Sequence, residues 1–566
     1  MQRIPAIFLL MLAFLGISVA QNGVSAWLVD SLIKVFPDSA APAPLKFSSI
    51  ATARNGHSSF QIALRSTSPA SVKVRMTPPR LKKTTLETSV FHVGYVRVAS
   101  HPKDVPLDEL VRPEVGLYPD PLYPLTTKWT LDAGRTEAVW ISIFTPVDAS
   151  PGIYKGAVEI RSGKRKLRLP FQVEVFAATV PKEQKLWVTN WLWLDREVLA
   201  KHYPRMNDDP EIYWRVVENI GRTMAAYKQN VVLIPVRKLA SARLVNGTMQ
   251  YDFSEFDRWV DIFDRAGTAK MIEGGHLSER AGGGFDAPYV LPTDLVENGQ
   301  VVRKELPNDD PRAEQNLRDF LRQLRQHLKQ KGWLNRYVQH IHDEPHGPEM
   351  PVYRHFAMIV REEMPEVPTI DAIDLKEDIP SVEPTTIWVP ILSSFDDKLD
   401  LVREHESRGG QGWYYICLFP RGRYLNRFID YPLLKTQLLP WLNFRYGLTG
   451  YLHWGGNWWT DDPINDLQPN WGGDTFLPAG DDAIVYPDPA HDGVFVSTRL
   501  EIFREGVEDY ELLREAQLGV PKRAETLGKA VVPGFTDYTR DVSRFREYER
   551  ELLKIATQTD QVSSHD

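Results

Sequence analysis

The sequence has few cysteines, no excess of positive charge and, after its first 20 residues, no long hydrophobic run. With Cys417 as its one cysteine, the chain cannot form an internal disulfide, and we expect this thiol to be a buried small hydrophobic group. A net charge of −7 offers nucleic acid no electrostatic attraction, so we expect no nucleic-acid partner. No later stretch is apolar enough to span a bilayer, which argues against a transmembrane segment.

The first 20 residues have the pattern of a secretory signal peptide. Arg3 supplies the positive end, residues 7–15 form the apolar stretch, and residues 18–20 form a small-residue cleavage site before Gln21. No cysteine follows that site directly, which argues against a lipid anchor there. The sequence therefore predicts a soluble protein exported to the periplasm or the extracellular space.

The rest of the chain is long enough for two or three domains and changes its pattern near residue 180. Residues 21–180 contain short alternating runs such as 59–64 and 138–143, with a turn at Gly163, which predicts a β-sandwich. Residues 181–520 alternate strands with helices, which is typical of a parallel sheet covered by helices. Residues 521–566 are expected to form a helical extension.

Eight candidate strands in the second region predict a (β/α)8 barrel. Helices are expected over 311–331, where Asp310 caps and Gly332 ends the helix, and over 433–446 and 497–517. Residues 460–489 are expected to be a long loop. The expected strands are 186–192, 230–236, 268–274, 336–342, 369–372, 386–391, 412–418 and 449–454.

The fourth of these strands leads into two adjacent carboxylates, Asp343 and Glu344, followed by Pro345. The proline ends the strand and is expected to hold Glu344 in an extended conformation. Neighbouring residues can share one pocket where the pleat ends, and the carboxyl ends of barrel strands carry the chemistry in such folds. Two crowded carboxylates acquire different pKa values, which separates an acid from a charge stabiliser.

Other polar and aromatic residues are expected at the same mouth of the barrel. Flat apolar rings suit the faces of a sugar, while amide and imidazole groups suit its hydroxyls. By placement, the candidate substrate-binding residues are Trp454, Tyr415, Asn457, His276, Asn190 and Trp459.

An ordered set of motifs resembles glycoside hydrolase family 123, the β-N-acetylgalactosaminidases, and its uncharacterised relatives. The resemblance implies a β-sandwich before a (β/α)8 barrel, a glycan substrate, no cofactor and a retaining mechanism in which the substrate's 2-acetamido oxygen is the nucleophile. It implies that Glu344 is the general acid and base and that ionised Asp343 accepts the acetamido N–H. The motifs are 341–345, 413–415, 420–422, 426–430, 439–443, 447–454, 457–459, 497–501 and 504–510.

Two alternatives remain open from the residues alone. A metal-dependent hydrolase would use the cluster His340, His342, Asp343, Glu344 and His346, with His276 and His453 as further ligands. The position of His340 inside the strand favours a hydrogen-bonded interior residue instead. A non-catalytic glycan-binding protein of the same fold is the second alternative, and the intact pair of carboxylates argues against it.

Overall fold

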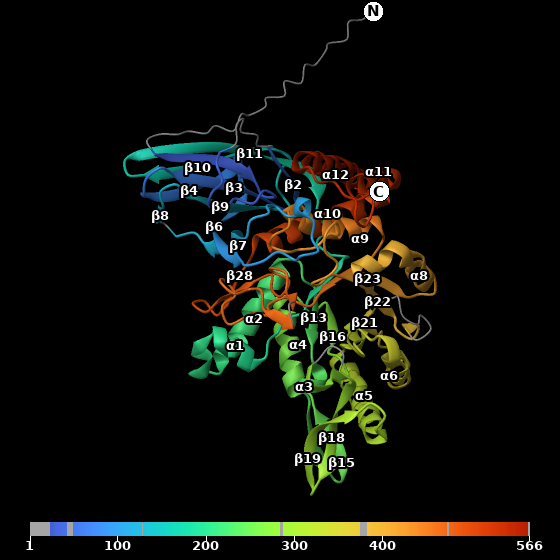
Figure 1. Cartoon of the computed structure of the whole chain (residues 1–566). Coiled ribbons are helices and arrows are strands. Elements are labelled where there is room, and N and C mark those ends of the chain that lie inside the picture. Colours follow the sequence, from blue (N-terminus) through green and yellow to red (C-terminus); the bar gives the residue numbers. More distant parts are fainter. Residues whose placement is uncertain are drawn as a thin grey trace, which may run out of the picture. The chain divides into compact units, whose positions relative to one another are not determined.

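The computed structural model describes residues 23–41, 49–126, 128–283, 287–373, 382–472 and 475–563, so the predicted signal peptide lies outside it. The chain forms two compact units: Met1–Gly94 with Leu122–Thr179, and Tyr95–Pro121 with Val180–Asp566 (Figure 1). Residues 95–121 therefore group with the second unit, whereas the sequence analysis placed them in the N-terminal domain. No helix among the described residues combines the length and the apolar character needed to cross a membrane.

The first unit is rich in β-structure and contains two sheets. The first sheet has the order β1 (Val24–Asp30), β3 (Gly56–Ser66), β9 (Thr136–Thr145), β6 (Glu87–Val98) and β7 (Gly116–Pro124). The second has the order β2 (Ile50–Arg54), β11 (Arg165–Thr179), β10 (Gly152–Ser162), β4 (Ala70–Leu81) and β5 (Thr84–Thr85), and β8 (Trp129–Leu131) also pairs with β4.

One hydrophobic core joins side chains from both sheets, including Ile62 and Val139 from the first and Val158 and Val173 from the second. The alternation in the sequence explains this arrangement, because every second residue of a strand points to the same face. The predicted hairpin is confirmed: β10 and β11 pair antiparallel, and Gly163 at their turn has a φ of +58°.

The second unit has a parallel strand at each of the eight expected places. The strands are β12 (Trp187–Asn190), β13 (Val231–Ile234), β16 (Met271–Gly274), β20 (Tyr337–Gln339), β21 (Ile370–Ile373), β22 (Ile387–Pro390), β23 (Gln411–Tyr415) and β24 (Gly450–His453).

These strands form two parallel sheets, β12-β24-β23-β22-β21 and β13-β16-β20. A single bridge between Gln339 and Thr369 links β20 to the start of β21, and the Asn230 N–H donates to the Val188 carbonyl between β13 and β12. One hydrophobic cluster collects side chains from all eight strands: Val231, Met271, Val338, Ile370, Ile387, Trp413 and Leu452, with Trp187 packed against them.

Helices follow the strands along the chain. They are α1 (Arg196–His202), α2 (Glu211–Ala226), α3 (Val236–Leu239), α4 (Ser254–Ala266), α5 (Pro311–Lys331), α6 (Met350–Glu363), α8 (Phe395–Ser407), α9 (Leu433–Arg445), α10 (Thr498–Gly519), α11 (Pro521–Val531) and α12 (Val542–Ser563). The expected ends of α5 are confirmed: the Asp310 side chain accepts a hydrogen bond from the Arg312 N–H, and Gly332 has a φ of +72°.

Several short antiparallel pairs interrupt this alternation and were not expected. They are β14 (Ser241–Val245) with β15 (Thr248–Asp252), β17 (Glu279–Arg280) with β18 (Tyr289–Glu297) and β19 (Gln300–Pro307), β25 (Asn470–Gly472) with β26 (Thr475–Phe476), and β27 (Tyr486–Asp488) with β28 (Gly493–Phe495). The labels β15, β18 and β19 lie together in Figure 1, where the hairpins β14–β15 and β18–β19 project from the unit.

A buried ion pair involves the motif at the start of α10. Arg499 and Asp120 are both fully buried, and Arg499 Nη2 lies 2.8 Å from Asp120 Oδ2. Thr498 and Tyr486 also donate hydrogen bonds to Asp120, at 3.1 and 2.6 Å. Arg499 further donates to the carbonyls of Gly480 and Ala483, so this motif stabilises the fold of the second unit.

Candidate active site

The chain leaves β20 in a strained turn that carries the two carboxylates. Glu344 has a φ of +48°, in the left-handed region, so the prediction of an extended Glu344 was wrong. The hairpin insertion explains how this turn is held: Arg280 donates to the carbonyls of Asp343 and Glu344, each at 3.3 Å, and the Tyr289 hydroxyl donates to the Asp343 carbonyl. Such strain persists where surrounding contacts fix it, and it concentrates at functional sites.

The Glu344 side chain meets the end of β23. The hydroxyl of Tyr415 donates a hydrogen bond to Oε1 of Glu344. Burial raises the pKa of Tyr415 well above its usual range, and the negative charges of Glu344 and Asp343 raise it further. The Glu344 carboxylate, which follows β20, therefore reaches the end of β23.

The Asp343 side chain is 51% exposed and lies beside His276, with Oδ1 at 3.8 Å from His276 Nε2. Desolvation raises the pKa of Asp343, while the positive charges of His340 and Arg280 lower it. The sequence analysis expected Asp343 to be the readily ionised member of the pair. Desolvation disfavours the ionised form of Asp343, whereas the positive charges of His340 and Arg280 favour it.

A buried network lies behind Asp343. His340 is fully buried between two carboxylates, with Nδ1 at 3.1 Å from Asp371 Oδ1 and Nε2 at 3.5 Å from Glu273 Oε1. Burial disfavours its charged form, but the bonds to Asp371 and Glu273 outweigh this and raise the pKa of His340 to about 9. Burial raises the pKa of Asp371 to about 6 against the hydrogen bonds it accepts. The prediction that His340 is an interior hydrogen-bonded residue is confirmed.

The comparisons with known proteins identify the family. Residues 193–516 match "Glycoside hydrolase 123, catalytic domain", and residues 50–162 match "Glycoside hydrolase 123 N-terminal domain". The chain belongs to glycoside hydrolase family 123. It is therefore a glycosidase, and its substrate is a glycan.

A solved family 123 structure from Clostridium perfringens, described for glycolipid glycan hydrolysis, is 14% identical over 96% of this chain and 99% of that one, with a TM-score of 0.73. That likeness shows a shared fold. A family 2 β-galacturonidase from Eisenbergiella tayi (12% identity, 80% and 68% coverage, TM-score 0.29) and a family 10 xylanase from Thermobacillus composti (11%, 57% and 96%, 0.31) are too distant to inform the site. No curated protein sequence shows significant similarity to the chain.

Four of the predicted substrate-binding residues have tasks within the family 123 fold. Asn190 and Asn457 are buried: Asn190 contacts Gln229 and Arg427, and Asn457 binds both backbone groups of Trp193. The indole N–H of Trp459 donates to the Val485 carbonyl at 2.7 Å, and that of Trp454 donates to Asp481 at 3.2 Å. Substrate contact by all six residues stays a prediction. Tyr415 donates a hydrogen bond to Glu344, and His276 Nε2 lies 3.8 Å from Asp343 Oδ1.

The histidines near the pair do not form the predicted metal cluster. His342 lies against Ser278 and stacks on Tyr289 at 4.4 Å, and His346 Nδ1 lies 3.1 Å from the Glu344 carbonyl. A different trio, His276, His340 and Asp371, does place ligand atoms within 4.8 Å of one another. Both nitrogens of His340 already face carboxylates. This arrangement fits a network of ion pairs as well as it fits a metal site.

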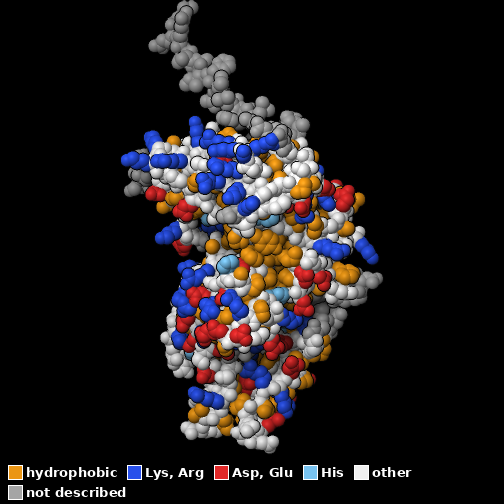
Figure 2. Space-filling view, turned by 90° about the vertical axis from the view of Figure 1, so that its left-hand side faces the viewer, with side chains coloured by type: hydrophobic (Ala, Val, Ile, Leu, Met, Phe, Trp, Pro, Cys, Tyr) orange, Lys and Arg blue, Asp and Glu red, His pale blue; other side chains and the backbone are white. Residues whose placement is uncertain are grey.

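Sequence reasoning missed Asp371, the anchor of this network. Its signal was a single acid in the apolar strand Ile370–Ile373, where an unpaired charge would be costly. It also missed Phe419, which follows β23 and is 45% exposed. Trp193, which follows β12, is 36% exposed. Figure 2 shows hydrophobic side chains gathered on one face with histidines at their border.

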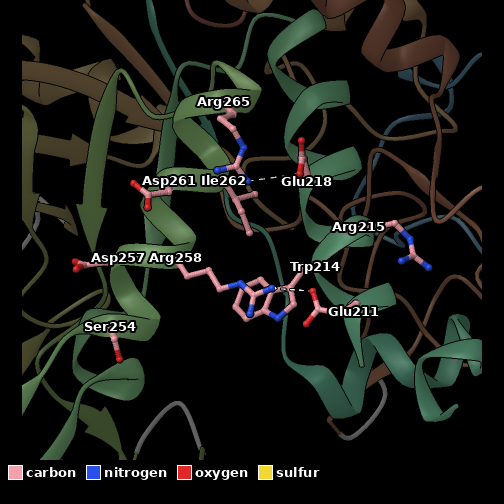
Figure 3. Close-up of a pocket in the computed structure, with 10 residues that line it drawn as sticks. All are labelled: Glu211, Trp214, Arg215, Glu218, Ser254, Asp257, Arg258, Asp261, Ile262 and Arg265. Atoms are coloured by element: carbon pink, nitrogen blue, oxygen red, sulfur yellow. Dashed lines mark hydrogen bonds and ion pairs between the residues drawn. The ribbon is translucent and has the colours of Figure 1, made fainter. Parts of the chain in front are cut away.

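A pocket of about 450 Å³ lies elsewhere, between α2 and α4 (Figure 3). Its aromatic residue, Trp214, is 8% exposed because the Arg258 guanidinium lies 3.8 Å from the ring centroid. Arg258 also pairs with Glu211 at 3.0 Å, and Arg265 lies 3.6 Å from Glu218. With its aromatic face covered by Arg258, this pocket offers no stacking platform for a sugar.

Proposed function

We propose that this family 123 glycosidase is an exported enzyme that removes β-linked N-acetylgalactosamine, or a related 2-acetamido sugar, from a glycoconjugate. The reaction retains the anomeric configuration through an oxazolinium intermediate. The observation that carries the proposal is the pair of consecutive carboxylates at one strand end, one bonded to Tyr415 and the other beside His276. The relative from Clostridium perfringens, described for glycolipid glycans, supports this class of substrate.

The proposal includes the closure of the eight strands into one (β/α)8 barrel behind a β-sandwich. The shared hydrophobic cluster and the bridge between Gln339 and Thr369 support closure. In such a barrel the carboxyl ends of the strands surround one mouth, so Asp343, Glu344, Tyr415 and His276 would face the same substrate.

In the first step, Glu344 gives its proton to the glycosidic oxygen as the bond from that oxygen to C1 breaks. The carbonyl oxygen of the substrate's 2-acetamido group forms a bond to C1 from the opposite face. Asp343 accepts the acetamido N–H and stabilises the positive charge that develops on the amide. No enzyme nucleophile is needed, as in the substrate-assisted exceptions to the two-carboxylate scheme.

In the second step, water attacks C1 while the bond from C1 to the acetamido oxygen breaks. Glu344, now a carboxylate, takes the proton of that water and returns to its starting state. Two inversions at C1 leave the product with the β configuration of the substrate.

The experiment is a panel of aryl glycosides with β-GalNAc, β-GlcNAc, β-Gal and β-GlcA, assayed with the wild type, Glu344→Gln and Asp343→Asn. We expect turnover of a 2-acetamido substrate and none of its 2-hydroxy counterpart. Glu344→Gln should lose most activity on substrates with poor leaving groups, because these need protonation. Equal turnover of β-Gal and β-GalNAc would overturn the proposal, and sugar binding without turnover by the wild type would favour a non-catalytic glycan-binding protein.

A metal-dependent hydrolase is the second candidate, and the trio His276, His340 and Asp371 is the observation that favours it. Chelation separates the two mechanisms. If a chelator abolishes activity and Zn²⁺ restores it, the metal-dependent mechanism is correct.

A further inference from the structure

We propose that His276 is the positioning residue of Asp343: a hydrogen bond from its Nε2 to Asp343 Oδ1 fixes the carboxylate so that Oδ2 receives the acetamido N–H. This inference rests on the proposed function and adds the group that orients the charge stabiliser. It is carried by the place of His276 between two carboxylates.

His276 Nε2 lies almost midway between two acceptors, 3.8 Å from Asp343 Oδ1 and 3.9 Å from Asp371 Oδ1. Both distances are beyond a hydrogen bond, and Nε2 is buried with no hydrogen-bond partner among the described residues. A buried donor left unbonded is costly, so a small movement that completes one bond is favoured.

Asp371 already has its donors. It accepts from the Ile341 N–H at 3.0 and 3.1 Å, from the Tyr353 hydroxyl at 3.0 Å and from His340 Nδ1 at 3.1 Å. The Asp343 side chain is half exposed, and its Oδ1 lies 3.8 Å from His276 Nε2. The spare donor of His276 therefore serves Asp343 when a substrate excludes water from that carboxylate.

The tautomer follows from the surroundings. His276 Nε2 lies 3.8 Å from Asp343 Oδ1 and 3.9 Å from Asp371 Oδ1. Because Nε2 faces two carboxylates, the proton belongs on Nε2. The His340 ring at 4.6 Å and the edge of Trp191 at 5.4 Å hold the plane of the imidazole.

The backbone before His276 is also fixed. A Cβ on Gly274 would lie 1.9 Å from the Tyr337 hydroxyl, and a Cβ on Gly275 would lie 2.8 Å from the Pro235 Cα. Only glycine allows this close approach. The backbone that carries His276 is therefore closely packed at the end of β16.

The test is a double-mutant cycle on the full chain with aryl β-GalNAc as substrate. We expect His276→Phe to lower kcat about 10- to 100-fold, the range for a hydrogen bond to a charged group, with KM changed less than about threefold. His276→Gln, which keeps a donor near the Nε2 position, should recover most of the loss, whereas His276→Asn should not. In the Asp343→Ala background, which removes the acceptor, His276→Phe should cost no further activity, because its partner is gone.

A binding measurement provides a second readout. The affinity for a GalNAc-thiazoline, which resembles the oxazolinium intermediate, should fall in parallel with kcat/KM in His276→Phe while thermal stability stays within a few degrees. If His276→Phe does not fold, the comparison of His276→Gln with His276→Asn takes its place.

Additive losses in the cycle, or equal activity of the Gln and Asn variants, would overturn the positioning role. If Asp343→Asn and Glu344→Gln are impaired on 2-acetamido substrates but His276→Phe is not, the positioning role fails while the proposed function stands. If the wild type does not need the 2-acetamido group, the proposed function itself fails. Zn²⁺-restored activity that is lost in all His276 variants would assign the residue to a metal instead.

Discussion

The hydroxyl of Tyr415, at the end of β23, donates a hydrogen bond to Oε1 of Glu344, which lies beyond the end of β20. The two residues are 71 positions apart in the sequence. Glu344 has a left-handed backbone, so its side chain is directed from a strained turn and held at its tip by a phenol. The proposed acid therefore has a fixed orientation before any substrate arrives, which is what proton transfer to a defined oxygen requires.

Tyr415→Phe should lower kcat by about 10- to 100-fold, because the hydrogen bond that orients the Glu344 carboxyl group is lost. The matched control is its neighbour: the Tyr414 hydroxyl donates to the Leu439 carbonyl at 2.9 Å, away from the carboxylates. Tyr414→Phe should reduce thermal stability and leave kcat nearly unchanged. Equal kcat values for the two variants would contradict an orienting role for Tyr415.

The activity of the enzyme should fall in acid at a higher pH than an ordinary aspartate would give. The proposed mechanism needs Asp343 ionised, and desolvation raises its pKa above the usual value of about 3.9. Activity is therefore lost as the pH falls through that raised pKa. Arg280→Gln removes a positive charge that favours the ionised form, so the acidic limb of kcat/KM should move to still higher pH. A limb that stays in place would show that Asp343 does not control it.

Stability should decrease between about pH 6.5 and 8. Burial raises the pKa of Asp481 to about 7 and that of Asp482 to about 8, and hydrogen bonds raise that of His340 to about 9. In this window the folded state binds more protons than the unfolded state, so the free energy of unfolding falls by up to about 1.4 kcal/mol per pH unit for each such group. Asp482→Asn should flatten the decrease of Tm with pH, and an unchanged slope would contradict the assignment.

Asp120→Asn should destabilise the protein by about 3–5 kcal/mol, because it leaves the fully buried Arg499 without its counter-charge. The control is an exposed pair on α5, Arg322 with Asp319, whose side chains are 49% and 40% exposed. Asp319→Asn should cost less than about 1 kcal/mol. Denaturant unfolding of the two variants measures both values.

Chelation should leave turnover unchanged. His340 is held between Asp371 and Glu273, so both of its nitrogens already face carboxylates and neither faces an open metal position. Dialysis against a chelator followed by the aryl β-GalNAc assay checks this, with Zn²⁺ added back as the control. Restoration by the metal would favour the metal-dependent mechanism.

The places of all eight parallel strands could be predicted because each is a short apolar run bounded by helix or turn signals, and α5 because its cap, stripe and terminal glycine agree. The hairpin from Tyr289 to Pro307 was missed, although its two-residue turn Asn298-Gly299, with φ values of +51° and +77°, is a sequence signal for a hairpin. Its role in holding the turn at Asp343 could not be predicted, because Arg280 and Tyr289, which bind the Asp343 carbonyl, are far from Asp343 in the sequence.

At the site, the neighbouring carboxylates were visible as a motif, but their partners were not. The contacts of Tyr415 with Glu344 and of His340 with Asp371 join separate strands, and no local pattern reports which strand ends meet. The left-handed backbone of Glu344 depends on Arg280 and Tyr289, so the simple rule for a residue before proline did not apply.

The segment Tyr95–Pro121 belongs to the same compact unit as the catalytic half of the chain, and it carries Asp120 and Glu109 into that unit. Glu109 lies 2.9 Å from the buried Lys435, as Asp120 lies beside Arg499. A chain of residues 180–566 alone would lack Asp120 and Glu109. Arg499 and Lys435 would then be buried without their counter-charges. The enzyme therefore cannot be trimmed to its catalytic half at a single cut without loss of both counter-charges.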